Sequence, residues 1–337
     1  MEVGAMIPTT IVGLFLFCLI LGQSTMALSQ GLQYGFYNDV CPEAEQIVNE
    51  VVSKFMHRDA NAAAGLIRLH FHDCFVNGCD ASVLLEKTPS GEPVEKDSPA
   101  NYKSLRGMDI IDKIKEKLED KCPGIVSCAD ILAFAARDAA VNAGVLPYLV
   151  PGGRRDGSTS RAVDTMILPG PFLTVEELTD TFAKKGLTQD EMVILSGAHS
   201  IGSAHCGTFG YRLYGEKPHY SQDPSLEPMQ AEFLKTECPP SSIPKDGSLG
   251  RHKVPLDSIT PTILDNMYYA GLLQGKGLLA SDQGLMKNFH TRNLVIAFAL
   301  NPIAWSRHFG LAMEKMGNLD VLTGDKGEIR RKCRRIN

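Results

Sequence analysis

The segment from Leu66 to Phe75 constrains the fold of this chain more than any other feature. An alanine-rich approach over residues 62–64 leads into straight-chain apolar residues, and this composition predicts a helix. Arg68 and His72 are four residues apart, so they share one face of that helix. A permanently charged guanidinium beside a titratable imidazole suits chemistry that moves a proton and stabilises an anion.

The predicted helix runs directly into a tight loop over residues 73–82 that carries oxygen ligands and two cysteines. Carboxylates, backbone carbonyls and a hydroxyl gathered in one turn form a ligand set suited to calcium rather than zinc. His70 is two residues from His72 and lies on a different helical face, so we interpret His70 as structural. The candidate calcium ligands of the loop are Asp73, Val76, Gly78, Asp80 and Ser82.

The first thirty residues have the composition of a targeting segment. Residues 11–22 form an apolar run that is too short to span a bilayer comfortably. Ala27 and Ser29 fit the −3 and −1 positions of a signal-peptidase site. We therefore expect a signal peptide over residues 1–29, one catalytic domain over 30–337, and no membrane association after cleavage. An uncleaved membrane anchor is the alternative, and the shortness of the run disfavours it.

Eight cysteines follow the predicted signal peptide, and an even number in a secreted chain indicates four disulfides. Eight cysteines permit 105 pairings, and the spacing alone does not choose among them. The formal net charge of −5 is mild, which argues against nucleic acid or an anionic membrane as the main partner.

Apolar residues recur at helical spacing along most of the chain, whereas long alternating strands are absent. Thr174 with Glu177, and Thr188 with Glu191, match the capping box of a helix start. We therefore expect a mainly α protein without a clear interdomain linker, and long loops over residues 86–104 and 214–256. The clearest predicted helices cover residues 43–56, 108–118, 127–142, 261–273 and 293–309.

Two long motifs resemble those of the plant secretory haem peroxidases, which form class III. Residues 68–80 are similar to the distal helix and loop of that family, and residues 195–202 to its proximal histidine motif. Shorter matches lie at residues 126–131, 153–156 and 281–283, so the resemblance covers the chain from about Gln33 to Cys333. It implies a mainly α fold in which two helical lobes sandwich one haem b. It also implies a peroxidase that reduces hydrogen peroxide while oxidising phenolic donors in one-electron steps.

On the distal side of the haem, the resemblance assigns a role to each matching residue. His72 would accept a proton from the peroxide and Arg68 would stabilise the developing negative charge. Asn101 would hold the other nitrogen of His72. A general base must be neutral to accept a proton, so its partner must be a group that does not ionise. Glu95 would orient Asn101, and Phe71 would wall the pocket.

On the proximal side, the resemblance makes His199 the axial ligand of the iron and Asp282 the acceptor of its other N–H group. A lone histidine beside glycine and alanine would otherwise be interpreted as part of the core. The resemblance adds a second calcium ion, with serine at position 200 where the family commonly has threonine; serine keeps the hydroxyl. Its ligands would be Ser200, Asp257, Thr260, Ile263 and Asp265.

The resemblance also implies the substrate site and the cysteine pairing. The Pro169 carbonyl would accept a hydrogen bond from a phenolic hydroxyl near the haem edge, with Phe172 lining the same channel. The pairing that joins residues 128 and 333 would stabilise the fold by roughly 4–5 kcal/mol on the loop-entropy model. The implied pairs are Cys41–Cys122, Cys74–Cys79, Cys128–Cys333 and Cys206–Cys238.

Two segments are less typical. Residues 304–308 depart from the Phe-rich helix entry that the family usually has there, which puts the local packing in doubt. The basic residues between Arg330 and Arg335 are interpreted as a solvated face, with loose binding to acidic wall polysaccharide as a second interpretation.

Three other functions compete with a secreted peroxidase. A zinc hydrolase would use His70, His72, Cys74 and Cys79, but the two histidines diverge on a helix and secreted cysteines prefer disulfides. A catalytically silent wall protein would show damage at the proton-transfer residues, which are present here. An intracellular peroxidase would lack the signal peptide and the eight cysteines. The resemblance therefore favours a monomeric enzyme of the cell wall or apoplast, with roles in oxidative stress, peroxide removal and the metabolism of wall phenolics and lignin.

Overall fold

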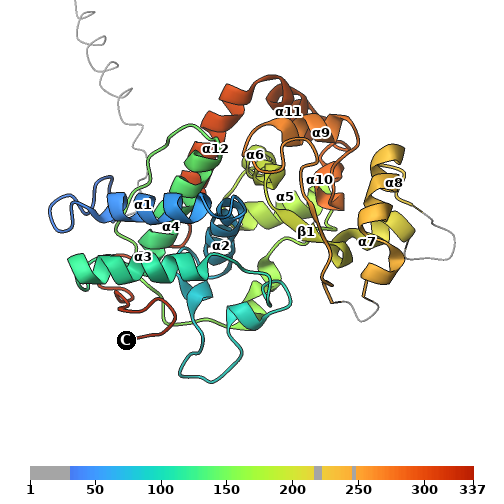
Figure 1. Ribbon diagram of the computed structural model, residues 1–337. Coiled ribbons are helices and arrows are strands. Elements are labelled where there is room, and N and C mark those ends of the chain that lie inside the picture. Colours follow the sequence, from blue (N-terminus) through green and yellow to red (C-terminus); the bar gives the residue numbers. More distant parts are fainter. Residues whose placement is uncertain (1–30, 216–221, 245–247) are drawn as a thin grey trace, which may run out of the picture.

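Helices dominate the computed structural model, which describes residues 31–215, 222–244 and 248–337 (Figure 1). The α helices are α1 (Ala44–Met56), α2 (Ala62–Val76), α3 (Met108–Lys121), α4 (Cys128–Ala143), α5 (Val175–Lys184), α6 (Gln189–Ser196), α7 (Cys206–Tyr214), α8 (Pro228–Glu237), α9 (Met267–Leu273), α10 (Ala280–Gly284), α11 (Phe289–Leu300) and α12 (Pro302–Met316). Short 3₁₀ turns are η1 (Ser82–Leu84), η2 (Glu95–Asp97), η3 (Ala162–Ile167), η4 (Gly197–Ser200) and η5 (Pro240–Ser242). Strands β1 (Ser203–His205) and β2 (Lys253–Pro255) pair antiparallel, with His205 opposite Lys253.

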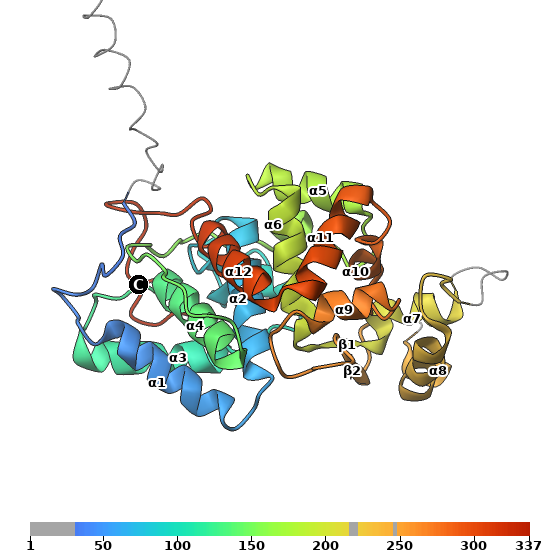
Figure 2. The ribbon, with the colours of Figure 1, turned by 90° about the horizontal axis from the view of Figure 1, so that it is seen from above.

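Helix α2 lies between two groups of helices. Figures 1 and 2 both show α1, α3 and α4 on one side of it and α7 and α8 on the other. Helix α4 is buried on nearly every face, as its apolar sequence predicts, and Ser127 caps its start by accepting a hydrogen bond from the Asp130 amide at 3.1 Å. Helix α2 packs against α4, so the catalytic candidates on α2 stand on a rigid support.

A further group of helices forms around α6, which precedes the turn that carries His199. The capping boxes at the starts of α5 and α6 are both confirmed by reciprocal hydrogen bonds. Helix α12 packs against α6 and α11, and one apolar core runs from α1, α3 and α4 through α2 into this group around α6. A smaller core lies under α7 and α8. The mainly α fold is thus confirmed.

Three predicted boundaries were wrong. Residues 261–266 form turns, because the Asp265 carboxylate accepts from the Met267 amide at 2.8 Å and α9 begins only there. The predicted helix 293–309 is broken at Asn301, whose side chain caps the new helix that Pro302 begins. The predicted loop 214–256 contains α8, because Glu227 caps that helix and Pro228 occupies its first turn.

The cysteine pairs are those that the resemblance implies. The basic C-terminal segment was wrongly interpreted as a solvated face at Arg330. This side chain is fully buried and donates to the carbonyl oxygens of Cys333 and Ala81 at 2.6 and 2.7 Å. The predicted signal peptide, residues 1–29, lies outside the described residues. Within the part of the chain that the structure describes, no helix has the length and hydropathy needed to cross a membrane.

Candidate active site

Helix α2 presents Arg68 and His72 one turn apart, as the spacing predicts. The Arg68 guanidinium donates to the backbone oxygens of Ala100 and Ser104, each at 3.0 Å, and to the Ser104 hydroxyl at 3.1 Å. These acceptors fix the guanidinium without neutralising it, and no carboxylate pairs with it in residues 31–215, 222–244 or 248–337. Arg68 therefore remains available for an anion.

His72 is held by Asn101 in one tautomer. The Asn101 amide nitrogen donates to the backbone oxygen of Glu95 at 2.9 Å, so its side-chain oxygen faces His72 Nδ1 at 2.5 Å. An amide oxygen only accepts hydrogen bonds, and Nδ1 must therefore carry the proton. The lone pair is left on Nε2, where a general base needs it.

Burial keeps His72 neutral. The ring is 7% exposed, and burial together with the charge of Arg68 holds the pKa of His72 well below 6.5, although the Asn101 hydrogen bond opposes this shift. Burial also lowers the pKa of Arg68, to about 10, so the guanidinium is still charged at neutral pH. The pair therefore combines an unprotonated base with a cation.

Glu95 orients Asn101 through its backbone rather than its side chain. Its carboxylate accepts hydrogen bonds from Asn77 and Ser160, both at 3.2 Å. Phe71 packs its ring edge-on to His72, with centroids 5.5 Å apart, which places an apolar wall beside the base. The structure thus brings all the distal candidates together.

His199 stands on the turn η4, directly after α6. Its Nδ1 donates to Asp282 Oδ1 at 2.8 Å, and the same carboxylate oxygen accepts from the Tyr268 hydroxyl at 3.0 Å. Asp282 is 3% exposed, whereas the His199 side chain is 38% exposed. Burial lowers the pKa of His199, but the charge and hydrogen bond of Asp282 outweigh it and raise that pKa above 6.5.

The charge of Arg68 lowers the pKa of both His72 and His199, so the guanidinium lies within electrostatic range of both rings. His199 Nε2 has no hydrogen-bond partner among the described residues, and in the neutral ring it bears the lone pair, since Nδ1 then carries the proton that is donated to Asp282. A neutral histidine with one nitrogen held by a carboxylate and the other free is the usual form of a metal-ligating histidine. These residues therefore fit a haem whose iron His199 would bind.

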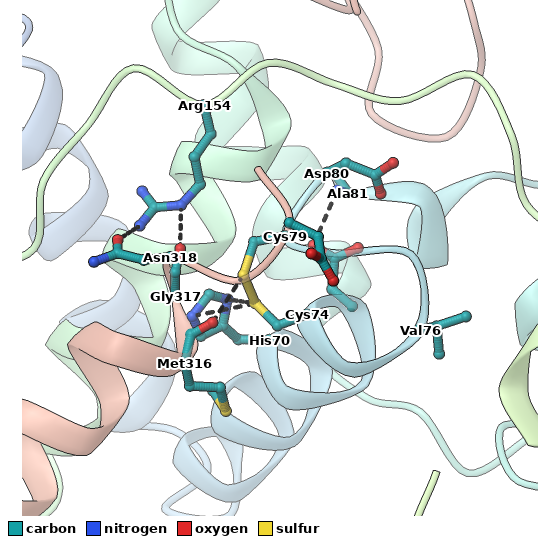
Figure 3. Close-up of a disulfide and its surroundings, with 12 residues drawn as sticks. His70, Cys74, Val76, Cys79, Asp80, Ala81, Arg154, Met316, Gly317 and Asn318 are labelled. Atoms are coloured by element: carbon teal, nitrogen blue, oxygen red, sulfur yellow. Dashed lines mark hydrogen bonds between the residues drawn. A yellow bond between two sulfur atoms is a disulfide. The ribbon is translucent and has the colours of Figure 1, made fainter. Parts of the chain in front are cut away.

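The five candidate calcium ligands lie in the last turn of α2 and in the segment that follows it, and Figure 3 labels Val76 and Asp80 among them. Burial and the neighbouring charge of Asp80 raise the pKa of Asp73 well above 3.8, and burial raises that of Asp80 to about 6. The buried Ser82 hydroxyl lies close to the carboxylates of Asp80 and Glu95, but it has no hydrogen bond of good geometry to the described residues. Gly78 adopts a φ of +96°, and a Cβ there would lie 2.5 Å from the Asp320 carbonyl oxygen. Two buried carboxylates and an unpartnered hydroxyl fit a bound cation.

The second set of candidate calcium ligands is also brought together. The Ser200 hydroxyl donates to the Ile263 carbonyl at 2.9 Å and lies 3.3 Å from Asp265. The Thr260 hydroxyl donates to Asp265 at 2.9 Å and lies 3.2 Å from Asp257. Burial and the charge of Asp265 raise the pKa of Asp257. This cluster of hard oxygens suits the same cation.

Pro169 lies half-buried in the loop after η3. The side chain of Phe172, three residues later, is 67% exposed. An open groove begins beside Phe172, and its other walls are Pro171, Gly207, Thr208, Tyr211, Leu249 and Ala280. Pro169 itself is not among the walls of this groove, which begins two residues later at Pro171.

The zinc alternative is excluded by the cysteine chemistry. His70 lies 3.6 Å from Cys74 Sγ, but Cys74 and Cys79 are joined in a disulfide and offer no thiolate (Figure 3). Sequence reasoning missed Tyr268 on Asp282, and it missed Lys185, which donates to the Val76 carbonyl at 3.2 Å. Lys185 and Val76 are 109 residues apart, whereas Tyr268 and Asp282 are only 14 apart, and the sequence carries no signal for either contact.

The fold, together with His72 held by Asn101 and His199 held by Asp282, is that of a haem peroxidase. A model of the peroxidase family matches residues 48–301. Peroxidase 5 of Vitis vinifera is 50% identical over 315 residues, which cover 93% of this chain and 94% of that relative. Peroxidase 47 of Arabidopsis thaliana is 46% identical over 310 residues (92% and 90%), and peroxidase 1 of Zea mays is 43% identical over 337 residues (99% and 90%). The chain therefore belongs to the peroxidase family, among the class III peroxidases of plants, and is an enzyme that uses hydrogen peroxide.

Proposed function

We propose that this peroxidase binds one haem b through His199, reduces hydrogen peroxide with His72 and Arg68, and takes its electrons from small phenols. The overall reaction converts two phenols and one hydrogen peroxide into two phenoxyl radicals and two molecules of water. One observation carries the proposal. Two imidazoles from distant parts of the chain each have Nδ1 held by a partner, which leaves Nε2 free on both.

The residues of the chain perform the acid–base part of the reaction. When bound, haem supplies the redox chemistry that reduces peroxide and then oxidises the phenol. Nε2 of His72 takes a proton from one oxygen of the peroxide and returns it to the other oxygen, which leaves as water. Arg68 stabilises the negative charge that develops on the leaving oxygen, an effect worth about 3 kcal/mol in comparable sites. Asn101 keeps the proton on Nδ1 throughout.

Two calcium ions complete the proposed site, one in the loop after α2 and one beside Ser200. The first would neutralise Asp73 and Asp80 directly after His72, and the second would fix the segment that follows His199. The groove that begins at Pro171, two residues after Pro169, supports a phenolic reductant, whose hydroxyl would donate a hydrogen bond to the Pro169 carbonyl. We further propose a monomer secreted to the cell wall or apoplast, acting in peroxide removal, oxidative stress and the metabolism of wall phenolics and lignin.

Two substitutions test the histidine assignments. For His199→Ala we expect loss of haem or a gross change in its absorption spectrum, because the ligand is removed. For His72→Ala we expect retained haem but loss of most of the reactivity with peroxide, measured by rapid mixing. His57→Ala, at an exposed position beyond α1, is the control and should change neither readout. An unaltered spectrum for His199→Ala would overturn the ligand assignment, and a wild-type rate for His72→Ala would overturn the base.

A further inference from the structure

A row of aromatic side chains leads away from His199 into the interior. The ring centroids of His199 and Tyr268 are 6.3 Å apart, those of Tyr268 and Tyr269 are 5.0 Å apart, and those of Tyr269 and Trp305 are 6.0 Å apart. Each pair meets edge to face. Tyrosine and tryptophan are the side chains that lose an electron most readily after free thiols. The row therefore joins the haem ligand to the chain's single tryptophan through contacts between oxidisable rings.

Trp305 is packed tightly against the turn that carries His199. The indole is 1% exposed, and its N–H donates to the Ile194 carbonyl at 3.3 Å. A Cβ at Gly197 would lie 2.6 Å from the indole nitrogen and 2.7 Å from the Tyr269 hydroxyl, so only glycine permits this approach. Burial and the close contact hold the indole in one position relative to His199, two residues beyond Gly197.

The row ends at Trp305. The next ring is that of Phe309, with centroids 5.3 Å apart, and phenylalanine is far harder to oxidise. No free thiol competes in the described part of the chain, because its eight cysteines are paired. A buried indole at the end of such a row has no contact through which to exchange electrons with a bulky external donor. It can still supply an electron inward.

We propose that Trp305 is an internal one-electron reductant of this peroxidase, used when peroxide is present and the external reductant is scarce. The proposal rests on His199 as the haem ligand. Its consequence is a second redox function: the protein itself replaces one of the two electrons that peroxide has removed.

The electrons and protons balance along the row. Peroxide is reduced to water by the established activity, which leaves the enzyme short of two electrons. Trp305 supplies one of them, and its electron passes through Tyr269 and Tyr268 toward His199. The Tyr268 hydroxyl keeps its hydrogen bond to Asp282 Oδ1 at 3.0 Å. The net change is the loss of one electron from Trp305, which becomes a radical cation, with no net proton movement.

The chain's single tryptophan makes the experiment unambiguous. The loaded enzyme is mixed with peroxide in the absence of reductant, frozen within milliseconds, and examined by electron paramagnetic resonance. One sample carries ring-deuterated tryptophan and the other does not. We expect a protein radical whose line shape changes on deuteration, and oxidised Trp305 in the peptide digest of the same sample. An unchanged line shape overturns the proposal.

Three variants test the route. Trp305→Phe keeps an aromatic ring in the core, and the Ile194 carbonyl still accepts from the Tyr269 hydroxyl at 3.1 Å. This variant should lose the tryptophan signal. Tyr268→Phe should also lose it, because the row is interrupted. Tyr37→Phe is the matched control, since Tyr37 is likewise buried and bonded to a carboxylate, Asp130 at 2.7 Å, but belongs to no row leading to His199.

The outcomes separate this proposal from the proposed function. A normal haem spectrum and normal turnover with a phenol in Trp305→Phe and Tyr37→Phe leave the peroxidase assignment intact, whatever the radical experiment shows. Loss of the tryptophan signal in Tyr268→Phe but not in Tyr37→Phe supports the route. A signal that persists in Tyr268→Phe, or vanishes equally in Tyr37→Phe, overturns it.

Discussion

Asn101 decides which nitrogen of His72 carries a proton. Its own amide group is oriented by the Glu95 backbone, so a conformational preference of the main chain is passed through two hydrogen bonds to the catalytic base. A neutral partner is essential here. A carboxylate at position 101 would hold Nδ1 equally well but would stabilise the protonated ring, which is useless as a base.

The pH dependence of peroxide reduction follows from this arrangement. His72 acts only when unprotonated, and its pKa in the folded protein lies well below 6.5, so the rate should stay constant as pH falls through 6.5. For Asn101→Asp we expect a raised pKa of His72, with the rate falling as pH drops through the new value. The acid limb of the profile should move up by about one unit or more, measured by rapid mixing with peroxide.

Asn142→Asp provides the control for that experiment, because Asn142 lies on the exposed side of α4 and bonds to Ser53 at 3.0 Å. This change adds the same charge far from His72 and should leave the profile unmoved. An acid limb that is identical in Asn101→Asp and the wild type would show that His72 is not the group whose protonation limits the rate.

Individual residues were predictable where chemistry and helical spacing coincide. The spacing of Arg68 and His72 on one helix face follows from the sequence alone, and the structure confirms that shared face. The roles of Asn101 and Asp282 came only from the resemblance, because the contacts that join them to the histidines cross 29 and 83 residues of chain. Tyr268 was missed since nothing in its own segment distinguishes it from a core tyrosine.

At the scale of elements, the loop after α2 is the segment whose geometry depends most on an ion. Ser82 is informative because its buried hydroxyl has no hydrogen bond from the described residues. Removing that hydroxyl breaks no well-formed hydrogen bond within the described residues, so its effect on calcium binding can be separated from its effect on the protein alone.

For Ser82→Ala we therefore expect weaker calcium binding and unchanged or slightly higher stability of the calcium-free protein. Thermal unfolding with excess calcium and with a chelator measures both effects. Calcium should raise the melting temperature of the wild type, because a ligand that binds only the folded state stabilises it. The rise should be smaller in Ser82→Ala.

Thr291→Ser is the control: it removes a buried methyl group outside the calcium loop and keeps the hydroxyl that donates to the Leu285 carbonyl at 2.6 Å. It should leave the calcium-dependent rise as large as in the wild type. Equal rises in Ser82→Ala and the wild type would show that Ser82 is not a ligand.

Elements were predictable where their signals are local. The capping boxes of α5 and α6 and the apolar faces of α1 and α4 lie within a few residues, and all were confirmed. The break between α11 and α12 was missed although Pro302 marks it, because the apolar pattern continues across the break. Residues 261–266 read as helix because their periodicity gives no sign of the hydrogen bonds from Ser200 and Thr260 that hold them in turns.

At the scale of the whole molecule, Asp130 and Arg154 join three distant segments. Asp130, on α4, accepts from the Tyr37 hydroxyl and from the Gly153 amide at 2.7 and 2.6 Å. Arg154 donates to Asp130 at 2.8 Å and to the carbonyl oxygen of Gly317, just after α12, at 2.7 Å (Figure 3). Both charged side chains are completely buried. The sequence placed these residues in motifs but gave no indication that they meet.

Breaking this pair should destabilise the entire fold, because removal of one partner leaves the other charge buried without compensation. For Arg154→Met we expect the free energy of unfolding to fall by about 3–5 kcal/mol. The shift of the denaturant midpoint measures this loss. The double variant Asp130→Asn with Arg154→Met should recover part of the loss, since neither charge is then stranded. Arg161→Met is the control, because Arg161 pairs with Asp164 at the exposed surface and should leave stability nearly unchanged. If Arg154→Met proved as mild as Arg161→Met, the buried pair would contribute to neither the fold nor the alignment of its segments.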